Sequence, residues 1–230
     1  MKLYFPVPPQ ADGVLLRNFL RRCAVSTELA RAVKFHGSGF FADGRPILAN
    51  RRLAAGQMLS FELPADGEGV APQPEIPVQV VHEDAFALLL EKPPRLAVHP
   101  TLNYPLDTLA NGYAAWAAAQ GRSTVFRPVN RIDKDTSGLV LAARNSYAAP
   151  LLAQGVEKLY YAIVEGELPL GPGVIDAPIG RQALHCAKQT YTIPAYTPMP
   201  DGIVIDWEAP QQRITVESPL PADLQALLTD

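Results

Sequence analysis

The sequence contains few of the residues that build metal centres and disulfide frameworks. Its two cysteines, Cys23 and Cys186, lie far apart and form no C-x-x-C pair, and its four histidines are scattered along the chain. We therefore predict reduced thiols in a cytoplasmic protein, and no metal site. No stretch of eighteen uncharged apolar residues occurs, and the start, MKLYFPVPPQ, carries prolines where a signal peptide would be apolar. A membrane span and secretion are therefore not expected.

Net charge is also small, but it is unevenly distributed. The 230 residues carry a net charge of −3, which by itself argues against a nucleic-acid partner. Residues 1–60, however, hold nine basic and three acidic side chains, a balance of +6, whereas the other 170 residues hold eleven basic and twenty acidic ones, a balance of −9. This asymmetry is typical of a basic module that binds phosphate and is attached to a second unit, although chance variation between small domains explains it equally well.

Residues 14–35 predict two short helices, because leucine and phenylalanine recur there at helical spacing. Ser26 is a suitable N-cap for the second helix. The A-D-G-R segment at 42–45 then predicts a tight hairpin turn, followed by a strand that ends near 59–63. Both helices would carry exposed arginines able to bind an RNA phosphate backbone, although basic residues more often only face solvent. The candidates are Arg17, Arg21, Arg22 and Arg31.

Prolines, glycines and acidic residues make up residues 64–76, which show no apolar periodicity. This composition predicts a semi-extended linker. We place a domain boundary here, with an N-terminal domain at 1–64, a linker at 65–76 and a second domain at 77–230.

The second domain alternates apolar strand patterns with two helical stretches. Strands are predicted within 77–92, 139–143 and 158–166, and helices within 107–119 and 146–155. Because strands outnumber helices, the pattern predicts an α+β fold around a mixed or antiparallel sheet.

The segment R-I-D-K-D-T-S-G, residues 131–138, places two carboxylates two positions apart behind an arginine. Such residues are common in purely structural turns, because Asp, Ser and Gly bond the local backbone or tolerate its unusual angles. However, this turn leads directly into the apolar strand L-V-L-A-A, where a carboxylate would be partly desolvated and would need a cation such as Arg131 nearby. A carboxylate held in this way can act as a nucleophile or a base. These considerations do not distinguish Asp133 from Asp135.

The same segment, continued as R-I-D-K-D-T-S-G-L-V-L, resembles the signature of the RluA-type pseudouridine synthases, R-L-D-x-x-T-S-G followed by an apolar strand. Three further segments resemble motifs of that family in the same order. They are the stretch from E-D to V-H-P at 83–100, K-L-Y-Y-A-I-V-E-G at 158–166 and E-S-P-L-P-A-D-L-Q-A-L-L at 217–228. The N-terminal piece is similar to the RNA-binding domain of ribosomal protein S four. The resemblance therefore implies such a domain followed by a catalytic domain on a mixed, largely antiparallel sheet.

The resemblance also implies a reaction. A uridine in RNA loses its C1′–N1 bond, the base turns, and it rejoins the ribose through C5, without a cofactor. The uridine must leave its stack, which costs a few kcal/mol. The partner would be a structured RNA, either ribosomal or transfer RNA, and we expect a monomer with no metal and no membrane contact.

The family motifs assign roles to individual residues. Asp133 is implied as the catalytic carboxylate, whether nucleophile or base, because Asp135 falls on a variable position. Arg131 is the arginine of the motif. Tyr160 corresponds to the active-site tyrosine that meets the base, although a strand aromatic is more often a core residue. Three further residues are substrate-binding candidates: Asn130, where many members have histidine, and Thr136 and Ser137, which would shape the turn.

Two departures from the family pattern affect these expectations. Arg95 occupies the usual glycine of K-P-x-G-L. More importantly, the family continues after A-P-I-G-R with T-G-R-x-H-Q-I-R-x-H, which supplies the arginine that pairs with the catalytic Asp, and no such segment follows residues 180–181 here. Either the printed sequence omits a segment of the protein or the protein lacks it. We favour the first, since losing core strands would leave unpaired sheet edges.

Three hypotheses follow, and an RNA uridine isomerase is the leading one. The second is a non-catalytic RNA-binding protein that keeps the synthase fold with an incomplete site. The third, a structural domain with a D-x-D turn, is disfavoured by the ordered set of family motifs.

Overall fold

The computed structural model describes residues 1–163 and 183–226. Its N-terminal part comprises β1 (Lys2–Pro6), a short 3-10 helix (Pro9–Ala11), α1 (Leu16–Arg22), α2 (Thr27–His36), β2 (Phe40–Ala42), β3 (Arg45–Ile47) and β4 (Met58–Glu62). The following part comprises β5 (Gln79–Glu83), β6 (Ala87–Lys92), α3 (Leu109–Ala119), β7 (Ser137–Ala143), α4 (Ala148–Leu152), β8 (Glu157–Ile163), β9 (Ala183–Ile193), β10 (Ala195–Met199), β11 (Gly202–Asp206), β12 (Gln212–Glu217) and α5 (Ala222–Ala226). None of the described helices is both long and apolar enough to cross a membrane.

Local signals in the sequence produce the N-terminal elements as predicted. The Ser26 side chain caps α2 by accepting a hydrogen bond from the Leu29 N–H at 3.1 Å. The turn between β2 and β3 has Asp43 and Gly44 at φ 51° and 75°, the left-handed values that a two-residue hairpin turn requires. The two helices, the hairpin and the strand that ends near residue 62 are confirmed.

The first sheet combines strands from both ends of the chain, in the order β10-β11-β1-β4-β2-β3. The β10–β11 hairpin joins it by parallel pairing of β11 with β1, with Lys2 opposite Gly202. Gly202 is required at this contact, because a Cβ atom there would lie only 1.8 Å from the Lys2 carbonyl oxygen. The N-terminal sheet thus includes two strands from the predicted second domain. The boundary at 64–76 itself stays a prediction.

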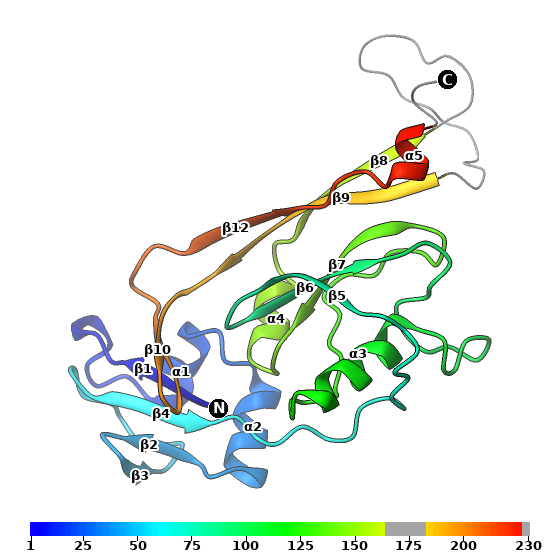
Figure 1. Cartoon of the computed structure of the whole chain (residues 1–230). Coiled ribbons are helices and arrows are strands. Elements are labelled where there is room, and N and C mark those ends of the chain that lie inside the picture. Colours follow the sequence, from blue (N-terminus) through cyan, green and yellow to red (C-terminus); the bar gives the residue numbers. More distant parts are fainter. Residues whose placement is uncertain (164–182, 227–230) are drawn as a thin grey trace.

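The second sheet has the order β12-β9-β7-β6-β5, and β8 pairs with β9. Its pairings are antiparallel except that between β7 and β9, which is parallel. The sheet is therefore mixed and largely antiparallel, and the fold is α+β, as predicted. Strand β7 lies inside it and is buried along its whole length, whereas β8 is exposed over nearly its whole length. In Figure 1, β8, β9 and β12 run together away from the N-terminal sheet.

Residues 64–76 form no helix or strand but are not a free linker. The Asp66 carboxylate accepts hydrogen bonds from Ser123 and Arg127. The Asn111 side chain, at the start of α3, donates to the Ala71 carbonyl at 2.8 Å. A Cβ atom at Gly112 of α3 would lie 2.8 Å from Ile76. The segment is therefore packed against α3, and its assignment as a linker between two domains stays a prediction.

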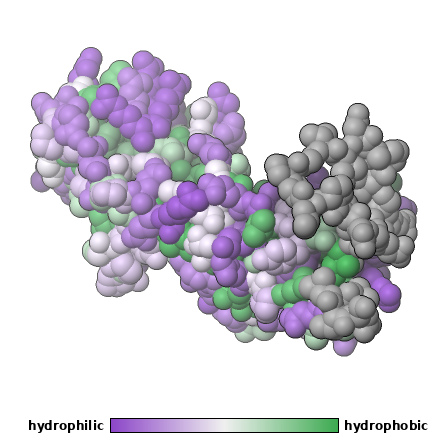
Figure 2. All heavy atoms as spheres, turned by 90° about the horizontal axis from the view of Figure 1, so that it is seen from above, coloured by the Kyte–Doolittle hydropathy of each residue, from purple (hydrophilic) through white to green (hydrophobic). Residues whose placement is uncertain are grey.

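One continuous cluster of buried residues joins the two sheets. At its centre, the Tyr147 hydroxyl donates to the Cys23 carbonyl at 2.9 Å and lies 3.2 Å from the Trp207 indole N–H. Phe5 of β1 packs edge-on against Tyr147, with ring centroids 5.9 Å apart. The two sheets consequently form one packed body. Figure 2 shows hydrophilic residues predominating on the end of the visible face that lies over the N-terminal sheet.

Candidate active site

The predicted turn precedes β7 and is closed by a hydrogen bond of 3.1 Å from the Thr136 N–H to the Asp133 carbonyl. Immediately after it, Gly138 adopts φ 106° where β7 meets β9. A Cβ atom at Gly138 would lie 2.4 Å from the Cys186 carbonyl oxygen. Only glycine therefore allows the end of the turn to approach β9 this closely.

A buried lysine lies beneath the turn. Lys92 ends β6, pairs with Gly138 across the sheet and is fully buried. Its Nζ donates to the carbonyl oxygens of Pro93 at 2.8 Å, Leu96 at 2.7 Å and Lys134 at 3.0 Å. Burial lowers the pKa of Lys92 to about 8, and the charges of Asp135 and Asp133 act against that shift. The ammonium group thus holds the turn and places a positive charge near both carboxylates.

Sequence reasoning did not identify Lys92 as a site residue. The available signal was a lysine at the end of a run of apolar residues, directly before two prolines. A charge in that position is either a solvated strand end or a buried group with dedicated partners, and the structure shows the second.

The two carboxylates are more exposed than predicted. Asp133 and Asp135 both face solvent. Among the described residues, neither forms an ion pair with Arg131, which is also exposed. The expectation of a partly desolvated carboxylate beside Arg131 is therefore wrong, because the turn stands above the sheet and the nearby cation is Lys92, on the strand below.

Asp133 nevertheless lines a cleft of about 740 Å³. One wall is the segment 97–101, and the other is 129–134, which includes Asn130, Arg131 and Asp133. Lys134 and Lys158 add two further cations. The cleft therefore combines one carboxylate with several positive charges and is large enough for a nucleotide.

Tyr160 lies on β8 beside β9, opposite Cys186 at an irregularity of the pairing. Its side chain is 37% exposed, and its hydroxyl contacts the Cys186 thiol. Burial, followed by the Cys186 thiol and the negative charge of Asp133, raises the pKa of Tyr160 to about 12. Tyr160 is therefore within electrostatic range of Asp133, and neither it nor Tyr161, which is 50% exposed, is a core residue.

The three remaining motif residues are buried. The Asn130 Oδ1 accepts a hydrogen bond from the Leu141 N–H at 2.8 Å, while its buried Nδ2 has no partner among the described residues. Ser137 is hydrogen bonded to His185 Nδ1 at 3.0 Å, and the other ring nitrogen lies 3.2 Å from the Ser218 hydroxyl. Ser137 thus joins the end of the turn to β9, Thr136 closes the turn itself, and Asn130 lines the cleft.

The four arginines of the N-terminal helices are exposed, and none of them lines the cleft of Asp133. Arg17, Arg21 and Arg22 lie on α1 and Arg31 on α2, without an ion pair to any described residue. The structure therefore keeps the two predicted groups, carboxylates and arginines, on separate parts of the molecule.

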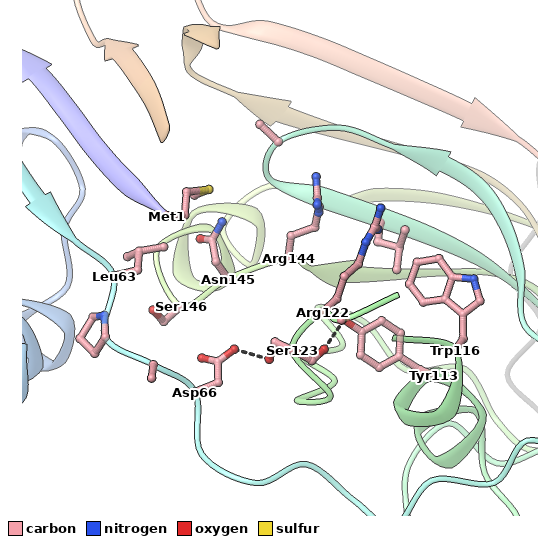
Figure 3. A pocket seen from close by; sticks show the side chains of 15 residues that line it. Met1, Leu63, Asp66, Tyr113, Trp116, Arg122, Ser123, Arg144, Asn145 and Ser146 are labelled. Atoms are coloured by element: carbon pink, nitrogen blue, oxygen red, sulfur yellow. Dashed lines mark hydrogen bonds between the residues drawn. The ribbon is translucent and has the colours of Figure 1, made fainter. Parts of the chain in front are cut away.

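A second cavity, of about 450 Å³, lies where the N-terminal segment meets α3 (Figure 3). Its two arginines, Arg122 and Arg144, both pair with Glu83, at 2.8 and 3.1 Å. Its carboxylate, Asp66, bonds Ser123 and Arg127. Because each of these charged groups already has an ionic partner, the cavity joins the two parts of the fold rather than offering an unpaired charge to a ligand.

Two expectations concern other parts of the chain. The missing segment predicted at 180–181 falls outside the described residues. No cluster of His, Cys, Asp or Glu able to hold a metal occurs in the parts of the chain that the structure describes.

Comparison with known proteins gives a consistent result. Residues 87–201 match the family model described as RNA pseudouridylate synthase. An uncharacterized RNA pseudouridine synthase of Bacillus subtilis, YjbO, is 27% identical over 81% of this chain and 66% of its own length. Ribosomal large subunit pseudouridine synthase D of Pseudomonas aeruginosa is 33% identical over 66% of this chain and 50% of its own. The chain thus spans between half and two thirds of the length of these relatives.

A solved human structure, RNA Pseudouridylate Synthase Domain Containing 4, aligns with 54% of this chain and 56% of its own. Its sequence identity is 14% and its TM-score 0.26. These values are too low to support an argument about the fold.

Proposed function

Because the chain belongs to the RNA pseudouridylate synthase family, we propose that it isomerises uridine to pseudouridine in a structured RNA, with Asp133 as the catalytic carboxylate. The observation that carries the proposal is the position of Asp133: it lines a nucleotide-sized cleft with Arg131 and Lys158, above the buried ammonium of Lys92. Asp135 lies on the same turn but is not among the residues lining that cleft.

The reaction needs a carboxylate and a proton acceptor, and no cofactor. The C1′–N1 bond of the uridine breaks, the base turns, a C1′–C5 bond forms, C5 loses its proton and N1 gains one. An ionised Asp133 serves either as the nucleophile at C1′ or as a base toward the ribose.

The other residues of the cleft have complementary roles in this proposal. Arg131, Lys134 and Lys158 bind phosphates of the RNA, for which exposed cations suffice. The buried Nδ2 of Asn130 is a hydrogen-bond donor without an acceptor among the described residues, so a carbonyl of the bound nucleotide would satisfy it. The half-exposed ring of Tyr160 provides a surface for the everted base.

The N-terminal part supplies general affinity for RNA. We assign residues 1–64 to an S-four-like domain whose exposed arginines on α1 and α2 bind the phosphate backbone, which positions a structured RNA without reading its sequence. The protein would act in the cytoplasm as a monomer, on ribosomal or transfer RNA.

A non-catalytic RNA-binding protein remains the second candidate. Two observations favour it: Asp133 is exposed, and no T-G-R-x-H-Q-I-R-x-H motif that would supply its arginine occurs in the sequence. Such a protein would bind RNA through the same basic surfaces without isomerising it.

One experiment separates the two candidates. Total RNA carrying tritium at uridine C5 is incubated with the wild type, with Asp133→Asn and with the matched control Asp135→Asn. The enzyme hypothesis expects release of tritium by the wild type and the control but not by Asp133→Asn. Binding of the RNA without release of tritium by any of the three would establish the binding protein instead.

A further inference from the structure

A small hairpin at 101–104 stands at the rim of the cleft. Its base is firmly held, because the Leu109 N–H donates to the Ala97 carbonyl at 2.8 Å and the Ala110 N–H to that of Val98 at 3.1 Å. Its tip is closed by two hydrogen bonds of 3.1 Å that Thr101 and Tyr104 exchange through their backbones. The turn between them presents a leucine, Leu102, whose side chain is completely exposed.

The hairpin is also joined to the turn of Asp133. The Lys134 ammonium donates to the Tyr104 hydroxyl at 2.9 Å and lies 4.1 Å from the centre of its ring. The backbone of Lys134 in turn accepts a hydrogen bond from the buried Lys92. Tyr104, Lys134 and Lys92 therefore connect the hairpin, the turn of Asp133 and the sheet.

A single exposed leucine needs no special explanation. Leu102, however, stands on a hydrogen-bonded tip whose base, through Thr101, lines the same cleft as Asp133. The surroundings are cationic, with Arg131, Lys134 and Lys158 in that cleft. A protein partner would meet a broad apolar patch, whereas this setting offers the leucine of the hairpin tip beside several cations, which suits a nucleic acid.

We propose that Leu102 is a wedge that enters the RNA stack where the target uridine has left it. Eversion of a nucleotide costs a few kcal/mol of stacking, and an apolar side chain inserted between base steps compensates for part of that loss. This inference rests on the proposed function, since only an enzyme or binder that everts a nucleotide needs a wedge. It adds a residue that contacts the neighbouring bases rather than the uridine itself.

The first test measures tritium release from C5-labelled total RNA. Leu102→Ala should lower kcat/KM by about tenfold, the effect of losing roughly 1.4 kcal/mol of apolar contact, and Leu102→Met should retain most of the activity. Leu106→Ala is the matched control, because Leu106 belongs to the same loop and is 44% exposed. Since Leu102 is fully exposed, each variant should melt at the wild-type temperature.

The second test needs no catalysis. A stem-loop RNA with one abasic residue in its stem, flanked by 2-aminopurine, imitates a stack from which a base has left. Wild type and Leu102→Met should change the 2-aminopurine fluorescence on binding, and Leu102→Ala should bind without that change.

The outcomes of the two tests distinguish the wedge from the enzyme. A Leu102-dependent fluorescence change without tritium release would support the wedge and refute the proposed isomerase. Tritium release that is equal in wild type and Leu102→Ala, with equal fluorescence, would refute the wedge and leave the isomerase intact. A loss of activity that Leu106→Ala reproduces would also refute the wedge, because the effect would then belong to the whole loop and not to Leu102.

Discussion

The Nζ of Lys92 lies 3.0 Å from the carbonyl oxygen of Lys134, the residue between the two carboxylates of the turn. The same nitrogen also bonds the carbonyls of Pro93 and Leu96, so all three of its protons have acceptors. One buried side chain therefore connects the end of β6, the segment after it and the turn of Asp133. This connection makes several properties of the site testable.

Replacing Lys92 by Met should destabilise the fold. The substitution keeps most of the side-chain volume but leaves three partly buried carbonyl oxygens without the Lys92 donor, and an unsatisfied group costs about 1–3 kcal/mol when it is buried. We expect the free energy of unfolding to fall by about 3 kcal/mol in urea titrations. Lys34→Met, an exposed lysine on α2, is the control and should change it by less than about 0.5 kcal/mol. Equal behaviour of the two variants would mean that Lys92 has no structural role.

The pKa of Lys92 predicts the pH dependence of stability. Its folded-state pKa of about 8 is below the ordinary value of 10.5, so between these values the unfolded chain binds more protons and stability rises with pH. The loss of stability caused by burying the charged ammonium is fully present below pH 8. It is relieved as the pH rises toward 10.5. Wild type should therefore gain stability relative to Lys92→Met between pH 8 and 10, by less than about 1.4 kcal/mol per pH unit. Parallel curves for the two proteins in urea titrations would contradict the shift.

Local sequence signals predicted the features that depend on neighbouring residues. The cap at Ser26 and the turn at Asp43-Gly44 each need only a few consecutive residues, and both are present. The turn at 131–138 and the buried strand after it were predictable in the same way, because an uninterrupted apolar run such as L-V-L-A-A after a polar turn is typical of a buried strand.

Features that depend on residues far apart in the chain were not predictable. Pairing of β1 with β11 joins residue 2 to residue 202, and neither strand carries a local sign of its partner. The Lys-Pro-Pro sequence indicated the end of a strand but not the burial of Lys92, since the acceptors for its protons come from two separate segments. The linker composition similarly did not reveal that Asp66 would bond Arg127.

Gly138→Ala should disrupt the junction of β7 and β9. The new Cβ would lie 2.4 Å from the Cys186 carbonyl oxygen, and φ 106° is strained for alanine. We expect a loss of at least about 2 kcal/mol of unfolding free energy, which includes the strain of about 1–3 kcal/mol for such a backbone angle. Gly155→Ala, with open space at its Cβ position and no positive φ, is the matched control. Urea titrations measure the free energy of unfolding of both variants. Equal values would show that the junction of β7 and β9 accepts a side chain at residue 138 without loss of stability.

Tyr160→Phe should affect chemistry more than stability. Because burial raises the pKa of Tyr160 to about 12, the phenol stays neutral and should add no ionisation to the pH–rate profile between pH 7 and 10. We expect tritium release to fall about 100-fold, as for loss of a hydroxyl that relays the C5 proton by accepting it while passing on its own, with RNA affinity retained because the ring that faces the base is unchanged. Tyr161→Phe, on the neighbouring residue, should keep wild-type activity. Equal rates of tritium release for the two variants would show that the Tyr160 hydroxyl has no role in the reaction.

The arginines of α1 and α2 can be tested through salt dependence. Each phosphate that a cation neutralises contributes about −0.7 to −0.9 to the slope of log K against log salt. Replacing Arg21, Arg22 and Arg31 by Gln should therefore flatten the slope by about 2–3 and weaken binding of total RNA at low salt, as measured by filter binding. Arg213→Gln is the control, because Arg213 is already paired with Glu157 at 2.6 Å. If the triple variant kept the wild-type slope, these helices would only face solvent, and the affinity would come from the cleft around Asp133.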